Sequence, residues 1–97
     1  MTLPVLLRPE AQDEVRDAFD WYEAAAPGLG ERFLAEFDGV LFRIAKNPAL
    51  FPPAFGFRRA VVRTFPYCIY FRETDSAIVV VAVFHGRRDP QRLRKRR

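Results

Sequence analysis

The chain has few of the residues that usually mark an extracellular, metal-binding or membrane protein. Its 97 residues include one cysteine and one histidine, Cys68 and His85. A single cysteine cannot form an internal disulfide, and no set of zinc ligands lies beside it in the sequence. No apolar run approaches the ~18 residues of a membrane span, and the N-terminus lacks the features of a signal peptide. We therefore expect a cytoplasmic protein without a structural metal.

Several catalytic signatures are also missing. The sequence has no Gly-rich phosphate loop, no Ser/His/Asp set and no cluster of metal ligands. The acids between residues 10 and 23 are spaced as on a solvated helix face. We therefore predict no cofactor and no metal site.

The chain is instead apolar and basic. Hydrophobic residues make up 49% of it, and this content suits a packed core in a single domain covering residues 1–97. The net charge of +4 is unevenly distributed: six acids and one base lie between Glu10 and Glu23, whereas seven bases and one acid follow from Arg87 onward. A basic C-terminal tail, about residues 87–97, suits an acidic or polyanionic partner. A merely solvated tail fits the same charges.

Hydrophobic periodicity predicts the order β-α-α-β-β-β. A short strand, Leu3–Leu7, precedes a helix that begins at Pro9 and is broken at residues 26–30. A second helix begins near Leu29 and ends before Pro48. After a loop over residues 49–56, three strands are predicted, at residues 57–64, 66–72 and 77–85.

This order predicts an α+β fold, with a helical hairpin packed on one face of a small antiparallel sheet. The last strand is apolar almost throughout, which indicates a central strand with both faces covered. Either the chain itself or a partner could cover the second face.

The groups that could support catalysis are basic. Arg59 and Arg63 would share one face of an extended strand. At the end of the last strand, His85 and Arg87 would also share a face if the chain stays extended. RNA cleavage without a metal needs a base, an acid and cations near the phosphate, and His85 with these arginines could supply them. A lone polar residue at the end of a core strand more often caps or packs, so we favour a structural or recognition role for His85.

Four segments in register resemble the RelE/ParE toxin superfamily of bacterial type II toxin–antitoxin modules. They are "WYEAAAPGLGERF" (21–33), "NPALFP" (47–52), "FPYCIYF" (65–71) and "HGRRDP" (85–90), and together they extend over nearly the whole chain. The resemblance implies the α+β fold predicted above. It also implies a cognate antitoxin, ParD-like or related, which wraps the toxin and could cover an open sheet face.

The superfamily divides into RelE-like ribonucleases, which cut messenger RNA on the ribosome, and ParE-like toxins, which poison DNA gyrase. Arg59 matches the first basic position of the ribonuclease pattern, but Val61 stands at the second. Cys68 replaces the arginine expected after the aromatic residue of the next strand, and no Tyr or His follows His85. The "FPY" and "HGRRDP" segments are closer to the ParE-like side.

The resemblance therefore favours a non-catalytic, growth-arresting toxin, of a kind associated with plasmid stabilisation, that acts by binding gyrase. His85 would then order the end of the last strand, and the target would be bound by the basic residues that follow it: Arg87, Arg88, Arg92, Arg94, Lys95, Arg96 and Arg97. The alternative is a ribosome-dependent endoribonuclease that uses His85, Arg59, Arg63 and Arg87.

Two further possibilities stay open. The chain could bind an antitoxin without being toxic, in which case its expression would not arrest growth. It could also bind nucleic acid through its basic tail, with an affinity that falls steeply as salt rises.

Overall fold

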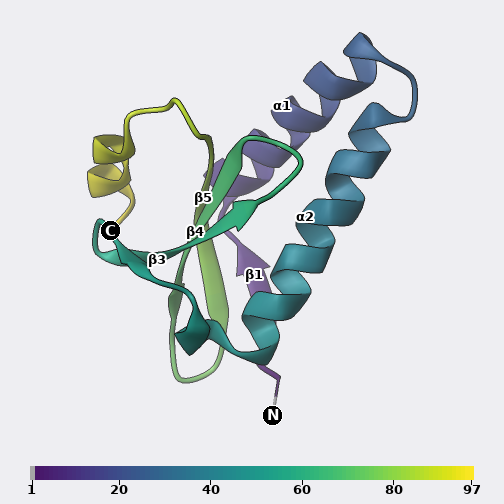
Figure 1. Cartoon of the computed structure of the whole chain (residues 1–97). Coiled ribbons are helices and arrows are strands. Elements are labelled where there is room, and N and C mark those ends of the chain that lie inside the picture. Colours follow the sequence, from purple (N-terminus) through teal and green to yellow (C-terminus); the bar gives the residue numbers. More distant parts are fainter. Residues whose placement is uncertain (1) are drawn as a thin grey trace.

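The computed structural model describes residues 2–97 and shows two long helices beside a sheet (Figure 1). The sheet has five strands. In chain order the elements are β1 (Val5–Leu7), α1 (Pro9–Ala25), α2 (Leu29–Lys46), the 3₁₀ turn η1 (Pro48–Leu50), β2 (Pro53–Ala54), β3 (Phe57–Val62), β4 (Tyr67–Glu73), β5 (Ile78–His85) and the 3₁₀ helix η2 (Pro90–Arg96). The strand order across the sheet is β1-β5-β4-β3-β2. The predicted α+β fold with a helical hairpin is confirmed.

The sheet is mixed, whereas the sequence predicted an antiparallel one. β1 pairs in parallel with β5, with Val5 opposite Ile78, and the other neighbouring strands are antiparallel. Local patterning does not show that two strands some 70 residues apart will pair, or in which direction they will run. It also missed β2 and the 3₁₀ turn η1, both within or beside the expected loop, and it extended the strand at residue 57 two residues too far.

The helical hairpin forms where the sequence predicts it. Pro9 occupies the first turn of α1, where its missing N–H costs no hydrogen bond. At the connection, the Glu23 carboxylate accepts hydrogen bonds from the N–H groups of Gly28 (2.8 Å) and Gly30 (2.9 Å). A Cβ atom at Gly30 would lie 2.8 Å from the Phe19 ring, so glycine there lets the two helices approach closely.

The helices cover one face of the sheet, and an aromatic cluster lies between the helices and the sheet. The Phe33 ring is fully buried and contacts Phe65 and Tyr67, each with ring centroids 5.4 Å away. Tyr22 from α1 packs edge-on against Phe65 at 4.7 Å. Large aromatic rings in such tilted contacts contribute both buried area and specific geometry, so this face is the main core.

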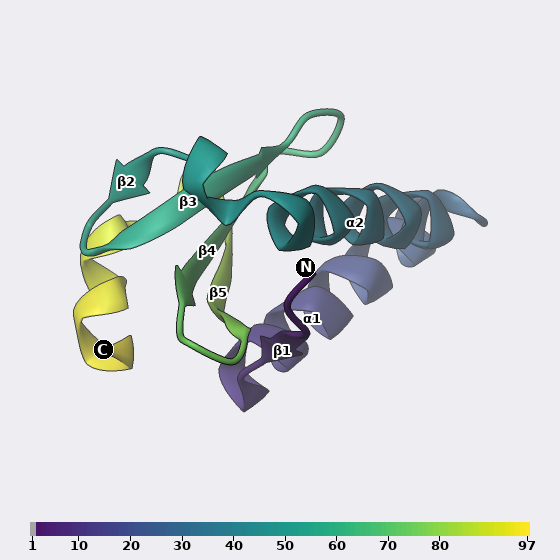
Figure 2. The same ribbon diagram turned by 90° about the horizontal axis from the view of Figure 1, so that it is seen from below.

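The opposite face of the sheet is covered by the chain's own C-terminal segment. Figure 2 shows the two helices on one side of the sheet and η2 on the other. Leu93 of η2 is 1% exposed and packs with buried residues of β3, β4 and β5: Phe57, Tyr70, Val81, Ala82 and Phe84. A register shift opposite Tyr70 and Phe71 turns both Val81 and Ala82 toward this outer face. Part of the second face is therefore covered without a partner.

None of the helices within residues 2–97 combines the length and hydropathy needed to cross a membrane.

Candidate functional site

His85 ends β5 on the face of the sheet that the helices cover. It lies opposite Tyr67 in the β4–β5 register, with ring centroids 5.4 Å apart and the planes at 79°. Its Nδ1 accepts a hydrogen bond from the backbone N–H of Arg87 (3.1 Å), and its carbonyl accepts one from the N–H of Arg88 (2.9 Å). The imidazole therefore stabilises the turn that follows the strand.

The four residues of the ribonuclease alternative do not converge. Arg59 lies opposite Tyr70, whose side chain belongs to the outer cluster, so the sheet separates it from His85. Arg63 was expected on the same strand face as Arg59, but β3 ends at Val62. Arg63 instead lines a hollow against α2, beside Glu36 and Arg43. Of the set, only His85 and Arg87 are neighbours.

The chain also turns after His85 instead of continuing as an extended strand. His85 and Arg87 therefore do not share a strand face, which corrects the expectation from an extended chain. The Arg87 side chain is exposed, whereas His85 is half-buried.

Cys68 and its aromatic neighbours have the chemistry of packed side chains. Burial raises the pKa of the Cys68 thiol, and the nearby positive charge of Arg59 offsets this only in part. Burial likewise raises the pKa of Tyr70, against an opposing hydrogen bond from Arg59. Burial also raises the pKa values of Tyr67 and Tyr22. Because a thiol with a raised pKa carries little thiolate at neutral pH, Cys68 is a poor nucleophile.

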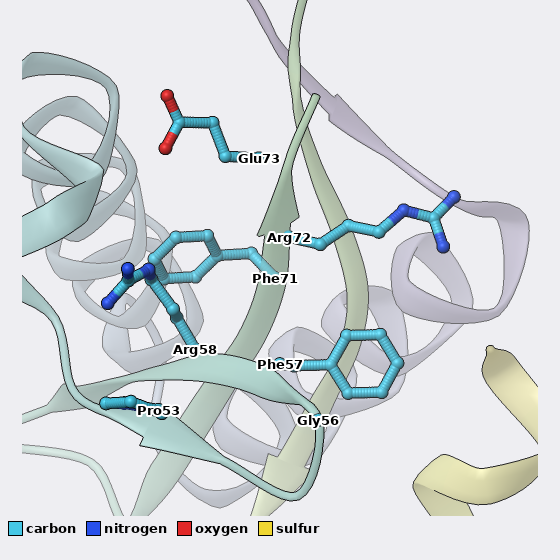
Figure 3. A pocket seen from close by; sticks show the side chains of 7 residues that line it. All are labelled: Pro53, Gly56, Phe57, Arg58, Phe71, Arg72 and Glu73. Carbon is cyan, nitrogen blue, oxygen red and sulfur yellow. The ribbon is translucent and has the colours of Figure 1, made fainter. Parts of the chain in front are cut away.

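A wide cavity of about 510 Å³ lies at the end of the sheet where β2 and β3 meet β4 (Figure 3). Its charged lining residues are Arg58, Arg72 and Glu73, and Arg58 already donates a hydrogen bond to the Phe51 carbonyl at 2.7 Å. None of the predicted site residues lines this cavity. The basic residues predicted to bind a target lie elsewhere, in the C-terminal segment.

The basic C-terminal segment is folded as a 3₁₀ helix. Asp89 caps its start by accepting a hydrogen bond from the Gln91 N–H at 2.9 Å. A 3₁₀ helix has three residues per turn, so side chains three apart lie in a row. Leu93 and Arg96 form the row that faces the sheet. The sequence could not show that this segment is folded, because the same charges fit a disordered tail.

Glu14 of α1 anchors this segment. Its side chain is 10% exposed, and its two oxygens accept hydrogen bonds from both terminal nitrogens of Arg96, at 2.8 and 2.9 Å. The same carboxylate accepts a third hydrogen bond from Arg88 (2.8 Å) and a fourth from the Val83 backbone N–H (2.9 Å). Arg96 in turn donates to the Val81 carbonyl at 3.1 Å. Bidentate, charge-assisted bonds of this kind are among the stronger ones in proteins.

This network divides the predicted target-binding residues into two groups. Arg88 and Arg96 pair with Glu14, and their guanidinium groups also lie 4.9 and 5.0 Å from the centre of the Phe84 ring. Their main contacts in the structure are therefore within the chain, and binding of a target by the basic residues of the segment stays a prediction. The basic residues of the segment that Glu14 does not hold are all exposed: Arg87, Arg92, Arg94, Lys95 and Arg97.

Sequence reasoning missed Glu14, although a signal was present. The apolar positions of α1 include Ala11, Val15 and Ala18, and Glu14 lies on the same helical stripe, one turn after Ala11. An acid on the buried stripe of a helix needs a partner, and the distant basic segment supplies it.

The fold matches that of a known family. Residues 5–90 match the family model described as the ParE toxin of the type II toxin–antitoxin system parDE. The chain belongs to the ParE toxin family. The resemblance to the RelE/ParE superfamily, on its ParE-like side, is thereby confirmed.

Similar proteins agree with this assignment. The chain is 36% identical over 92 residues to the protein named Toxin ParE2 in two strains of Mycobacterium tuberculosis. The match covers 93% of this chain and 88% of each relative. A chain of the structure titled chromosomal ParDE TA system from P. aeruginosa superposes with a TM-score of 0.75, covering 87% of this chain and 96% of that one. At 11% identity, that structure shows the shared fold of the family.

Proposed function

We propose that this member of the ParE family is a toxin that binds DNA gyrase and stabilises its DNA-cleavage complex. The observation that carries the proposal is the folded basic segment, which presents exposed cations on a defined surface instead of a free tail. The scattered positions of His85, Arg59 and Arg63 support a toxin that binds over one that cleaves. The cytoplasm is the proposed place of action, because gyrase works on chromosomal DNA there.

We further propose a ParD-like antitoxin as the partner that neutralises the chain. The family is defined by toxin–antitoxin systems, and the structural relative is titled as one. The exposed large apolar side chains include Leu6, Trp21, Phe42 and Leu50. Contact with a partner would remove such side chains from water, which is the usual driving force of association.

A gyrase supercoiling and cleavage assay tests the main proposal. Purified gyrase, relaxed plasmid and this protein are incubated with and without ATP. Loss of supercoiling or accumulation of linear plasmid at stoichiometric protein is the expected result. Unaffected gyrase, together with growth arrest on expression, would overturn it and favour the ribosome as target.

Two charge-matched variants localise the contact. Arg92 and Lys95 lie three apart on an exposed row of η2, so changing both to Gln removes two charges from the proposed surface. Changing Arg32 and Arg43 of α2 to Gln removes two exposed charges elsewhere. The first pair is expected to weaken the effect on gyrase and the second to leave it unchanged. Equal losses would argue against a contact through this segment.

His85→Ala separates this proposal from the ribonuclease alternative. A toxin that acts by binding is expected to keep most of its activity, since the contacts of His85 are with the turn after β5 and with Tyr67. An endoribonuclease would lose it while remaining folded.

A further inference from the structure

The β2–β3 turn contains a backbone conformation that its side chain does not favour. Phe55 has φ of 54° and is the only non-glycine residue with positive φ among residues 2–97. The next residue, Gly56, has φ of 84°. Two-residue turns with positive φ at both positions favour Asn-Gly, because a bulky side chain is strained there.

Packing does not explain Phe55. Its side chain is 51% exposed, so a large part of the ring lies in solvent. Strained positions of this kind tend to persist where a ligand or partner uses them. An exposed aromatic ring held in a strained turn therefore indicates a contact with something outside the chain.

A cavity of about 260 Å³ lies between this turn and the C-terminal segment. It is lined by the exposed Phe55, by the apolar residues Pro90 and Leu93, and by three long polar side chains: Gln91, Arg94 and Arg97. These three polar residues follow one another at intervals of three, so the 3₁₀ geometry of η2 brings them to one side. A Cβ atom at Gly56 would lie 3.1 Å from the Arg97 guanidinium, so glycine leaves room for it.

The lining has the chemistry of a site for one unpaired nucleotide. An aromatic face can stack on any base, the two guanidinium groups can pair with the flanking phosphates, and the Gln91 amide can bond to a base edge. None of the lining residues is acidic. The volume is below the roughly 300–1,000 Å³ of ordinary small-molecule sites, which suits a single base and not a whole cofactor.

We propose that the cavity between the β2–β3 turn and the C-terminal segment binds an unpaired nucleotide of a single-stranded nucleic acid. Phe55 stacks on the base, and Arg94 and Arg97 hold the phosphates on either side. Glu14 and Leu93 contribute indirectly, because they fix η2 against the sheet and so keep Arg94 beside Phe55. The site is separate from Arg92 and Lys95, on which the gyrase variants act.

Fluorescence anisotropy on the full chain tests the proposal. The probes are labelled oligo(dT) and oligo(rU) of about 12 nucleotides and a duplex of equal length, at about 50 and 200 mM salt. Either single strand is expected to bind more tightly than the duplex, and the stronger of the two identifies DNA or RNA as the source. Preference for the duplex, or no binding at the lower salt, would show the proposal to be wrong.

Phe55→Ala provides the decisive variant. Loss of one stacked base predicts a 5- to 150-fold weaker affinity, by about 1–3 kcal/mol of stacking. Phe42→Ala is the matched control, because Phe42 is 61% exposed and lies 5.0 Å below the Lys46 ammonium, yet belongs to a regular helix. Equal affinities of the two variants would overturn the assignment of the base to Phe55.

The remaining variants distinguish the loss of a contact with the nucleic acid from a loss of folding. Phe55→Asn suits positive φ, so it is expected to keep the circular dichroism and thermal unfolding of the native chain while losing the same affinity. Arg94→Gln and Arg97→Gln are each expected to reduce the salt slope by about 0.7, and Arg43→Gln to leave it unchanged. None of these assays contains gyrase, so their outcome is independent of the proposed target.

Discussion

The two faces of the sheet are covered in different ways. On the inner face, two long helices bury a cluster of aromatic rings. On the outer face, the seven-residue 3₁₀ helix η2 is held by the buried side chain of Leu93 and by the ion pairs of Glu14. The helices are held on the inner face by a large buried apolar area, whereas η2 is held on the outer face mainly by a few polar bonds. We therefore expect the outer cover to open before the rest of the fold, and it also carries part of the proposed nucleotide site.

The inner face should be the most sensitive to truncation. Phe33→Ala removes a fully buried ring that contacts Tyr22, Phe37, Phe65 and Tyr67. We expect a loss of about 3–5 kcal/mol in the free energy of unfolding, measured by urea denaturation. A cost below about 1 kcal/mol would mean that this cluster is not the main core.

Truncation of the outer cover should have a smaller and more local effect. Leu93→Ala is expected to cost about 2 kcal/mol, near the lower end for a buried leucine, because only one short segment packs there. Limited trypsin digestion should then cut first between Arg87 and Arg97, with the rest of the chain still folded. Digestion spread evenly along the chain would contradict a locally held cover.

Removal of the anchoring charge should loosen the same segment. Glu14→Gln leaves Arg96, which is 17% exposed, with one acceptor fewer and no negative partner. We expect a loss of about 1–3 kcal/mol, together with faster trypsin cleavage in the segment. Asp13→Asn is the control, since Asp13 pairs with Arg16 at 3.9 Å on an exposed surface, and should change stability by less than about 1 kcal/mol.

Alkaline pH should produce the smallest of these effects. Burial raises the pKa of Cys68 above its ordinary value of 9.0, so the folded chain holds this proton at a pH where the unfolded chain has lost it. The contribution of this thiol to the free energy of unfolding is fully present below about pH 9. It is lost as the pH rises from there through the pKa of Cys68 in the folded chain. Tyr22, Tyr67 and Tyr70 act in the same direction from about pH 10. The free energy of unfolding, measured between pH 8 and 11, should begin to fall at different pH values in the native chain and in Cys68→Ser.

Local signals accounted for most of the elements. Pro9, the break before Leu29 and Pro48 set the limits of both helices, because each restricts the backbone at its own position. The polar residues between β4 and β5 marked the hairpin, and apolar alternation marked the strands on either side. These signals act within a few residues, so they can be recognised without the rest of the chain.

The candidate site was less accessible to such reasoning. The sequence showed that residues 87–97 are basic, but it could not divide them into the pair that Glu14 holds and the five that face solvent. Phe55 was likewise part of an expected loop, since nothing beside it in the sequence indicates its positive φ or its cavity. Both features depend on segments about 40 to 80 residues apart, which only the folded chain brings together.

The sequence by itself determined the helical hairpin, the three long strands, the family and the charge difference between the two ends of the chain. Each of these follows from periodicity, from residues that restrict their own backbone, or from motifs in register. Only the tertiary structure decided that β1 runs parallel to β5, that η2 covers the outer face, and that Arg88 and Arg96 pair with Glu14. The reason is that these contacts are long-range: the partner of a buried charge or an open strand edge is chosen by the packing of the whole chain.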